Sequence, residues 1–154
     1  MTDKNDPEKF KSLRGFINKD ESIEELYFAY SASLRIFGVI QNLNELTRCL
    51  GVAPTHVHRR GDRRTPDSPP YKHDYWSYKA PLDEKEPLHT HIDALWSVFR
   101  GQKQYLIELK RDLTVDVFLG YRSNCDQAGI TVPHQSLRMF VELEVPFGMS
   151  VIIT

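Results

Sequence analysis

Cysteine is scarce in this chain, and long apolar runs are missing from it. Two cysteines in 154 residues are too few for the disulfide framework of a small secreted domain. No stretch reaches the length of a transmembrane helix, and the polar residues 1–9 contain no apolar segment typical of a secretory signal. We therefore expect a cytoplasmic protein that has no membrane partner.

The chain also has no excess of basic residues and no familiar catalytic motif. Its formal net charge is -1, so it lacks the overall positive field of a dedicated nucleic-acid binder. A glycine-rich phosphate loop, a Gly-x-Ser-x-Gly elbow and the common spacings of metal ligands are all absent. We therefore predict no catalytic residue, no cofactor and no bound metal, and we rank nucleic acid below protein as a partner.

What the chain does contain is regular apolar periodicity. Apolar and polar residues alternate in several segments, and this period of two is typical of strands. Strands are predicted over residues 28–36, 55–59, 74–80, 114–121 and 147–153. Steps of three and four between apolar residues indicate helices. Helices are predicted over 43–50, over 88–113 with a break at Gly101, and from Pro133 onward.

The order of these elements predicts the fold class. A strand–helix–strand–strand–helix–strand core is followed by one more helix–strand unit, which is a ferredoxin-like split βαβ layout. We expect a single α+β domain over residues 25–154, with a mainly antiparallel sheet that helices cover on one face. Residues 1–24 form an N-terminal extension, in which the spacing of Phe10, Leu13 and Phe16 fits a short helix. Nothing in the pattern specifies an oligomeric state.

The same periodicity predicts which side chains are buried. Trp76 is in phase with Tyr78 and Ala80, so we expect it in the core. Asp116 lies between two valines and must face either solvent or a buried partner, and we favour solvent. The helix after Pro133 is expected to bury Leu137, Phe140 and Val141. The last strand is expected to alternate through Phe147, Met149, Val151 and Ile153.

The connection between the second and third predicted strands is the most unusual segment. With its flanking residues from His58 to Tyr75 it contains four arginines, and its prolines at 66, 69 and 70 exclude a helix or a central strand. Its length is uncommon in a compact domain, and loops on rigid scaffolds often carry function. We therefore place the recognition site here, with the candidate binding residues His58, Arg59, Arg60, Asp62, Arg63, Arg64, His73 and Tyr75.

Two interpretations of these arginines stay open. Several guanidinium groups on one loop form forked donor sites for a carboxylate or a phosphate. Alternatively, the loop is a solvated surface in which Asp62 and Asp67 pair with the arginines.

The histidines also allow two interpretations. His56 and His58 lie two residues apart on a strand and so share a face, which makes them plausible co-ligands of a metal. Ordinary surface histidines are the favoured interpretation. The alternative is a metal-binding protein or an enzyme that uses His56, His58 and His73.

Several short motifs resemble one bacterial family. They are Leu34-Arg35-Ile36-Phe37-Gly38, Glu45-Leu46-Thr47, Leu50-Gly51-Val52-x-Pro54-Thr55, His58-Arg59-x-Gly61-Asp62, Tyr75-Trp76-Ser77 and Val117-Phe118-Leu119-Gly120-Tyr121. In this order and spacing, from about Leu26 to the C-terminus, they resemble the family called domain of unknown function 4279. The chain departs from that family at Asn42 and Asn44, where an acidic helix start is usual, and in its added N-terminal segment. The resemblance implies a small bacterial α+β domain and transfers no activity.

These observations favour a non-enzymatic binding domain that recognises a protein partner. An immunity-like or regulatory role is one version, and it rests on analogy alone. A third interpretation is weak nucleic-acid binding through the arginine loop, with Tyr75 as a stacking platform.

Overall fold

The computed structural model describes residues 25–125 and 129–154. The predicted extension at residues 1–24, with its expected helix, lies outside the described residues. The strands are β1 (Phe28–Gly38), β2 (His56–His58), β3 (Asp74–Lys79), β4 (Thr114–Ser123) and β5 (Met149–Ile153). The helices are α1 (Leu43–Leu50), α2 (Leu88–Phe99), α3 (Lys103–Leu109) and α4 (Arg138–Leu143), with short 3-10 segments η2 (Arg100–Gln102) and η3 (His134–Leu137).

The five strands form one sheet in the order β2-β3-β1-β4-β5. Neighbouring strands are antiparallel, except for the parallel pair β4 and β5. The first βαβ unit consists of β1, α1 and β2, and β3 lies between its two strands. The second unit runs from β3 through α2 and α3 to β4, and β1 lies between its two strands, so the two split βαβ units interleave. The predicted ferredoxin-like α+β fold is confirmed, and the extra helix–strand unit adds β5 as an edge strand beside β4.

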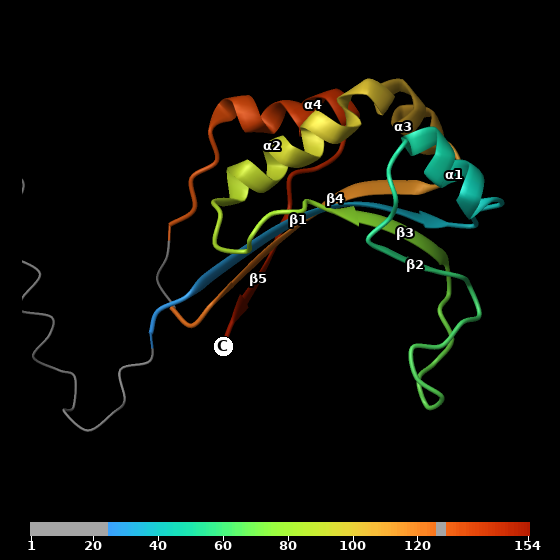
Figure 1. Cartoon of the computed structure of the whole chain (residues 1–154), viewed down its shortest axis with the longest axis horizontal. Helices are drawn as coiled ribbons and strands as arrows, with labels where there is room; N and C mark the ends of the chain where they lie inside the picture. The colour runs from blue at the N-terminus through green and yellow to red at the C-terminus, as the bar shows by residue number, and fades with distance from the viewer. Residues whose placement is uncertain (1–24, 126–128) are drawn as a thin grey trace, which may run out of the picture.

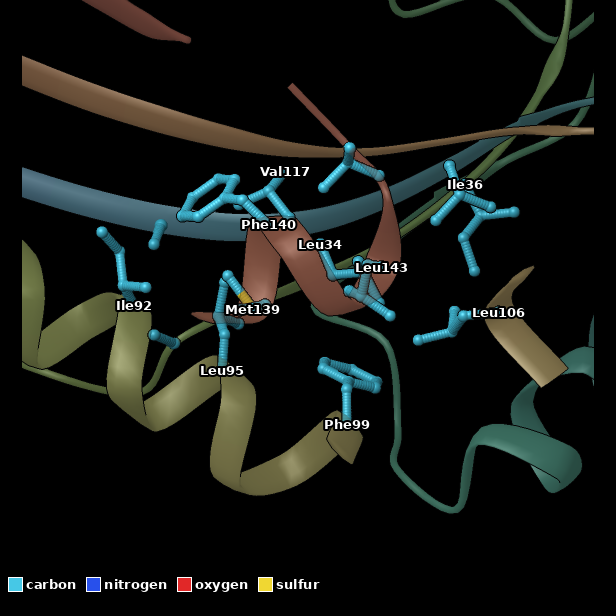
Figure 2. Packing of buried hydrophobic residues seen from close by; sticks show 14 of the residues in the cluster. Leu34, Ile36, Ile92, Leu95, Phe99, Leu106, Val117, Met139, Phe140 and Leu143 are labelled. Carbon is cyan, nitrogen blue, oxygen red and sulfur yellow. The ribbon is translucent and has the colours of Figure 1, made fainter. Parts of the chain in front are cut away.

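The helices of the described residues all cover the same face of this sheet (Figure 1). The residues of β1 that point toward them, Ala32, Leu34 and Ile36, are fully buried. Figure 2 shows side chains from β1, β4, α2, α3 and α4 meeting in one apolar cluster. Trp76 belongs to this cluster and is 0% exposed, so the prediction that it lies in the core is confirmed.

Local sequence signals explain where the helices begin and end. The Asn42 side chain accepts a hydrogen bond from the Glu45 amide at the start of α1, and Gly51 ends this helix with a left-handed φ of 73°. The long predicted helix is broken near Gly101, where η2 separates α2 from α3. No helix in the described ranges combines the length and the apolar character that a membrane span needs.

Two expectations about burial are wrong. In α4 the buried residues are Met139, Phe140 and Leu143, whereas Val141 is 75% exposed. The prediction counted helical turns of 3.6 residues from Pro133. The 3-10 segment η3 comes first and has three residues per turn, so different residues of α4 face the core. In β5 the alternating residues do not bury one face, because an edge strand packs against few neighbours, and Val151 is 53% exposed.

Candidate functional site

The sheet face opposite the helices, here called the open face, carries the side chains that alternate with the core residues. The strand registers place them in rows across the sheet. One row consists of His58, Tyr75 and Phe37, and the next row consists of His56, Ser77, Arg35 and Asp116. Aromatic, imidazole and charged groups are therefore gathered where β2, β3, β1 and β4 lie side by side.

The imidazole of His58 lies between two tyrosine rings. Its ring centroid is 3.6 Å from that of Tyr71 and 5.0 Å from that of Tyr75, with interplanar angles of 12° and 8°. Burial by these neighbours, followed by the charge of His56, lowers the pKa of His58 below its ordinary value of 6.5. His58 is therefore neutral at neutral pH, and its ring orientation is fixed by stacking.

The arginine-rich connection is an ordered hairpin (residues 59–73) that projects away from the helices (Figure 1). The Gly61 amide donates to the Tyr71 carbonyl at 2.9 Å, and the Tyr71 amide donates to the Asp62 carbonyl at 2.8 Å. A left-handed φ of 91° at Gly61 permits the turn. At the tip, a guanidinium nitrogen of Arg63 donates to the Ser68 carbonyl at 2.6 Å. These contacts bring Tyr71 back onto His58.

Asp74 fixes the base of the hairpin. Its buried carboxylate accepts hydrogen bonds from the Ile40 amide and the Arg60 amide, each at 2.9 Å. The Arg59 guanidinium lies 3.7 Å from the same carboxylate and donates to the Ile40 carbonyl at 2.9 Å. The hydrogen bond from Arg60 is the largest of the influences that lower the pKa of Asp74. Asp74 therefore joins the hairpin to the turn between β1 and α1.

The arginines of the hairpin are not neutralised by its own aspartates. Asp62 accepts a hydrogen bond from the Arg59 amide at 3.1 Å, so its carboxylate caps the backbone of the turn. Among the described residues, the guanidinium groups of Arg60 and Arg64 form no hydrogen bond and no ion pair. The interpretation in which Asp62 and Asp67 pair with these arginines does not hold, and cationic groups remain available on the hairpin.

The open face also contains an ion pair that the sequence does not predict. Arg35 and Asp116 lie opposite each other on β1 and β4 and form two hydrogen bonds, at 2.7 Å and 2.6 Å. As expected, Asp116 lies on the face that solvent reaches, with its side chain 24% exposed, but the register also supplies Arg35 as its partner. The Arg35 guanidinium also lies 4.9 Å from the centroid of the Phe118 ring. The sequence shows that two strands of alternating pattern each contain a charged residue, and that the two charges are opposite. It does not show that these residues lie opposite each other, which depends on the register between β1 and β4.

A hollow of about 260 Å³ is lined by Arg35, Phe37, His58, Tyr71, Lys72, His73 and Tyr75. The structure thus brings three predicted site residues, His58, His73 and Tyr75, to one place. Arg60, Arg63 and Arg64 do not line this hollow and lie on the hairpin instead. Because its walls are aromatic and cationic, the hollow suits an acidic or aromatic group of a ligand.

Other hollows have a different character. One of about 250 Å³ lies on the open face between Lys79, Phe118 and Arg122. Another, of about 560 Å³, lies between α1 and α3, where Glu45, Glu108 and other acidic and apolar residues line it. Its Tyr105 has a pKa raised to about 12, mainly by burial, so this phenol stays protonated at neutral pH.

The histidines do not assemble a three-ligand metal centre. Within the described parts of the chain, no three His, Cys, Asp or Glu side chains are grouped to hold an ion. His56 and His58 are neighbours, with 3.4 Å between His56 Nε2 and His58 Nδ1, and His73 is not grouped with them.

Comparison with known proteins identifies one family. No curated protein and no solved structure is significantly similar to the chain. A family model described as Domain of unknown function (DUF4279) matches residues 28–153, which include every strand and helix described above. The chain therefore belongs to the DUF4279 family.

Proposed function

We propose that this domain is a non-enzymatic binding protein that recognises a partner protein with the open face and the projecting hairpin. The observation that carries the proposal is the stack of Tyr71, His58 and Tyr75, which joins the hairpin to the face. Rigid aromatic groups surrounded by polar side chains are typical of protein recognition surfaces. An immunity-like or regulatory role in the bacterial cytoplasm is one form of this proposal, and sparse cysteine use supports that compartment.

The charges of this surface indicate the chemistry of the partner. Residues 59–74 contain five lysines and arginines but only three aspartates. Two of these aspartates, Asp62 and Asp74, are occupied by backbone amides. A partner with exposed carboxylates would gain charge-assisted hydrogen bonds from Arg60, Arg63 or Arg64, and aromatic contacts from the neighbouring stack.

The test is affinity capture from the native host with three forms of the full chain. The first is the wild type. The second carries a short Gly/Ser link in place of residues 63–70. The third is the matched control Arg111→Glu, which reverses an exposed charge away from the hairpin. We expect a stoichiometric protein that the wild type and the control retain and the shortened form loses, with unchanged thermal unfolding in all three. A partner retained by the shortened form contradicts the proposed site.

Nucleic-acid binding through the arginines would behave differently in the same measurements. It requires release of counterions from phosphates, so affinity for an oligonucleotide would fall steeply between low and physiological salt. We rank this function second because the chain as a whole has a net charge of -1. A steep salt dependence that disappears in Arg64→Glu would reverse the ranking.

A further inference from the structure

We propose that His56 and His58 form a two-histidine site for an exchangeable divalent transition-metal ion, with Zn²⁺ as the best geometric match. The site lies on the open face at the edge strand β2, where both residues point to the same side of the sheet. It shares His58 with the ring stack that joins the hairpin to the face, but metal binding is measured without a protein partner, so the two proposals can fail separately.

The separation of the two imidazole nitrogens carries the inference. His56 Nε2 and His58 Nδ1 are 3.4 Å apart. The two nitrogens also fit a long hydrogen bond in which the tautomers decide which ring donates. Two imidazole nitrogens that bind one tetrahedral Zn²⁺ at about 2.0–2.1 Å lie roughly 3.3–3.4 Å from each other. The pair therefore already has the spacing of adjacent ligands of one ion.

Stacking preorganises one of the two ligands. The faces of the His58 ring are covered by Tyr71 and Tyr75, with interplanar angles of 12° and 8°. A ring that is held by its faces keeps its edge accessible, and the ring nitrogens lie on that edge. Groups that fix the orientation of a ligating histidine commonly strengthen metal binding. His56 is exposed beside it, so an ion can enter from solvent.

The surrounding charges have opposing effects on a cation. Asp62 and Asp74 act on His58 as nearby negative charges. Arg59 opposes them, but its guanidinium lies against the Asp74 carboxylate. Arg35 and Lys72, which line the hollow beside His58, also repel a cation.

A site with two protein ligands holds an exchangeable ion, unlike a closed structural site. No third His, Cys, Asp or Glu is grouped with this pair in the described chain, so water completes the coordination. A site of this type binds an ion that exchanges, whereas a closed four-ligand site stabilises the fold. The domain should therefore remain folded after the metal is removed, with a melting temperature that falls only by the small amount that loss of a weakly bound ligand causes.

The experiment is calorimetric titration of Zn²⁺ into the full untagged chain after treatment with a chelator. We expect one ion per chain, and no measurable binding at the same concentrations in His56→Ala or in His58→Ala. Tyr71→Ala keeps both ligands but loses the stacking, so its affinity should fall by about tenfold. His134→Ala is the matched control, because it removes an exposed histidine elsewhere and should bind as the wild type does.

A second measurement needs no variant. The chain has six histidines, and NMR spectra of their imidazole nitrogens report which rings an ion touches. Shifts on Zn²⁺ addition that are confined to His56 and His58 support the site. The proposal is overturned by an absence of stoichiometric binding, by binding that survives both alanine variants, or by shifts centred on other histidines. Thermal unfolding of each variant without metal separates loss of ligand from loss of fold.

Discussion

The two faces of the sheet are built from the same strands, but their side chains are held in place in different ways. On the covered face, Leu34, Ile36 and Leu119 are fully buried against helices, and apolar contact alone fixes them. On the open face, Arg35 and Tyr75 are partly exposed, and directional contacts fix them: an ion pair with Asp116 and a ring stack. The covered face therefore sets stability, while the open face orients polar groups that water can still reach.

Adjacent residues of β3 give the largest expected difference between the faces. Trp76 is 0% exposed and donates a hydrogen bond from Nε1 to Thr47 Oγ1 at 3.0 Å. Trp76→Ala should lower the free energy of unfolding by about 3–5 kcal/mol. Tyr75→Ala removes a partly exposed ring from a stack and should cost about 1 kcal/mol. Urea unfolding of both variants measures this difference, and equal losses would show that the open face is also part of the core.

A substitution at Asp74 shows how much a buried polar group at the base of the hairpin contributes to the free energy of unfolding, compared with a core residue. Asp74→Asn keeps the size of the side chain but replaces one acceptor oxygen by a donor, facing the amides of Ile40 and Arg60. We expect a loss of about 1–3 kcal/mol in the free energy of unfolding at neutral pH. Denaturant unfolding measures it, with Asp67→Asn as an exposed control that should change little.

The same carboxylate predicts a dependence on acid. Its pKa is lowered in the folded state, so its stabilising effect is present above its ordinary value of 3.8 and is lost as the pH falls through the folded pKa. The wild type should therefore lose more stability than Asp74→Asn as the pH falls below about 4. Parallel curves for the two proteins would contradict this assignment.

His91 is another titratable group buried on the helical side of the sheet, and it should produce a smaller effect. It is fully buried on α2, and neither ring nitrogen makes a hydrogen bond with a described residue. Burial lowers its pKa below 6.5, although the nearby backbone of Glu86 and Asp83 opposes part of this change. Stability is thus complete above 6.5 and declines as the pH falls below it, because the unfolded chain binds the proton more readily. In unfolding experiments between pH 7 and pH 5, His91→Leu should show a flatter decline than the wild type.

The ion pair of the open face should contribute least. Arg35 and Asp116 remain partly solvated, with side-chain exposures of 31% and 24%. A double-mutant cycle with Arg35→Met and Asp116→Ala should give a coupling free energy of about 0.2–1 kcal/mol, which falls in high salt. A coupling well above this range would mean that the open face is less accessible to water than its exposure indicates.

Local patterns were sufficient to predict much of this architecture. The alternation over residues 28–36 and 114–121 predicts two central strands, and Gly101 predicts the break between α2 and α3. These features depend on neighbours within a few residues, so one segment of sequence contains the necessary information. Burial in α4 and β5 was mispredicted because it depends on the phase set by η3 and on a position at the sheet edge.

The candidate site was harder to predict than the fold. The sequence points to His58 and Tyr75, but Tyr71 joins them only because the hairpin folds back through hydrogen bonds between Gly61, Asp62 and Tyr71. The pairing of Arg35 with Asp116 likewise depends on the register between β1 and β4. Contacts between residues distant in sequence require the assembled sheet, and composition does not encode them.

The carboxylate of Asp74 has one further consequence, which concerns the order in which the molecule opens. It holds the Ile40 amide in the turn before α1 and the Arg60 amide at the base of the hairpin at the same time. Displacing Asp74 exposes both amides in a single event, so their protons should exchange with solvent at rates that rise and fall together. Any ligand that clamps the hairpin would then slow exchange at Ile40, on a segment that it does not touch.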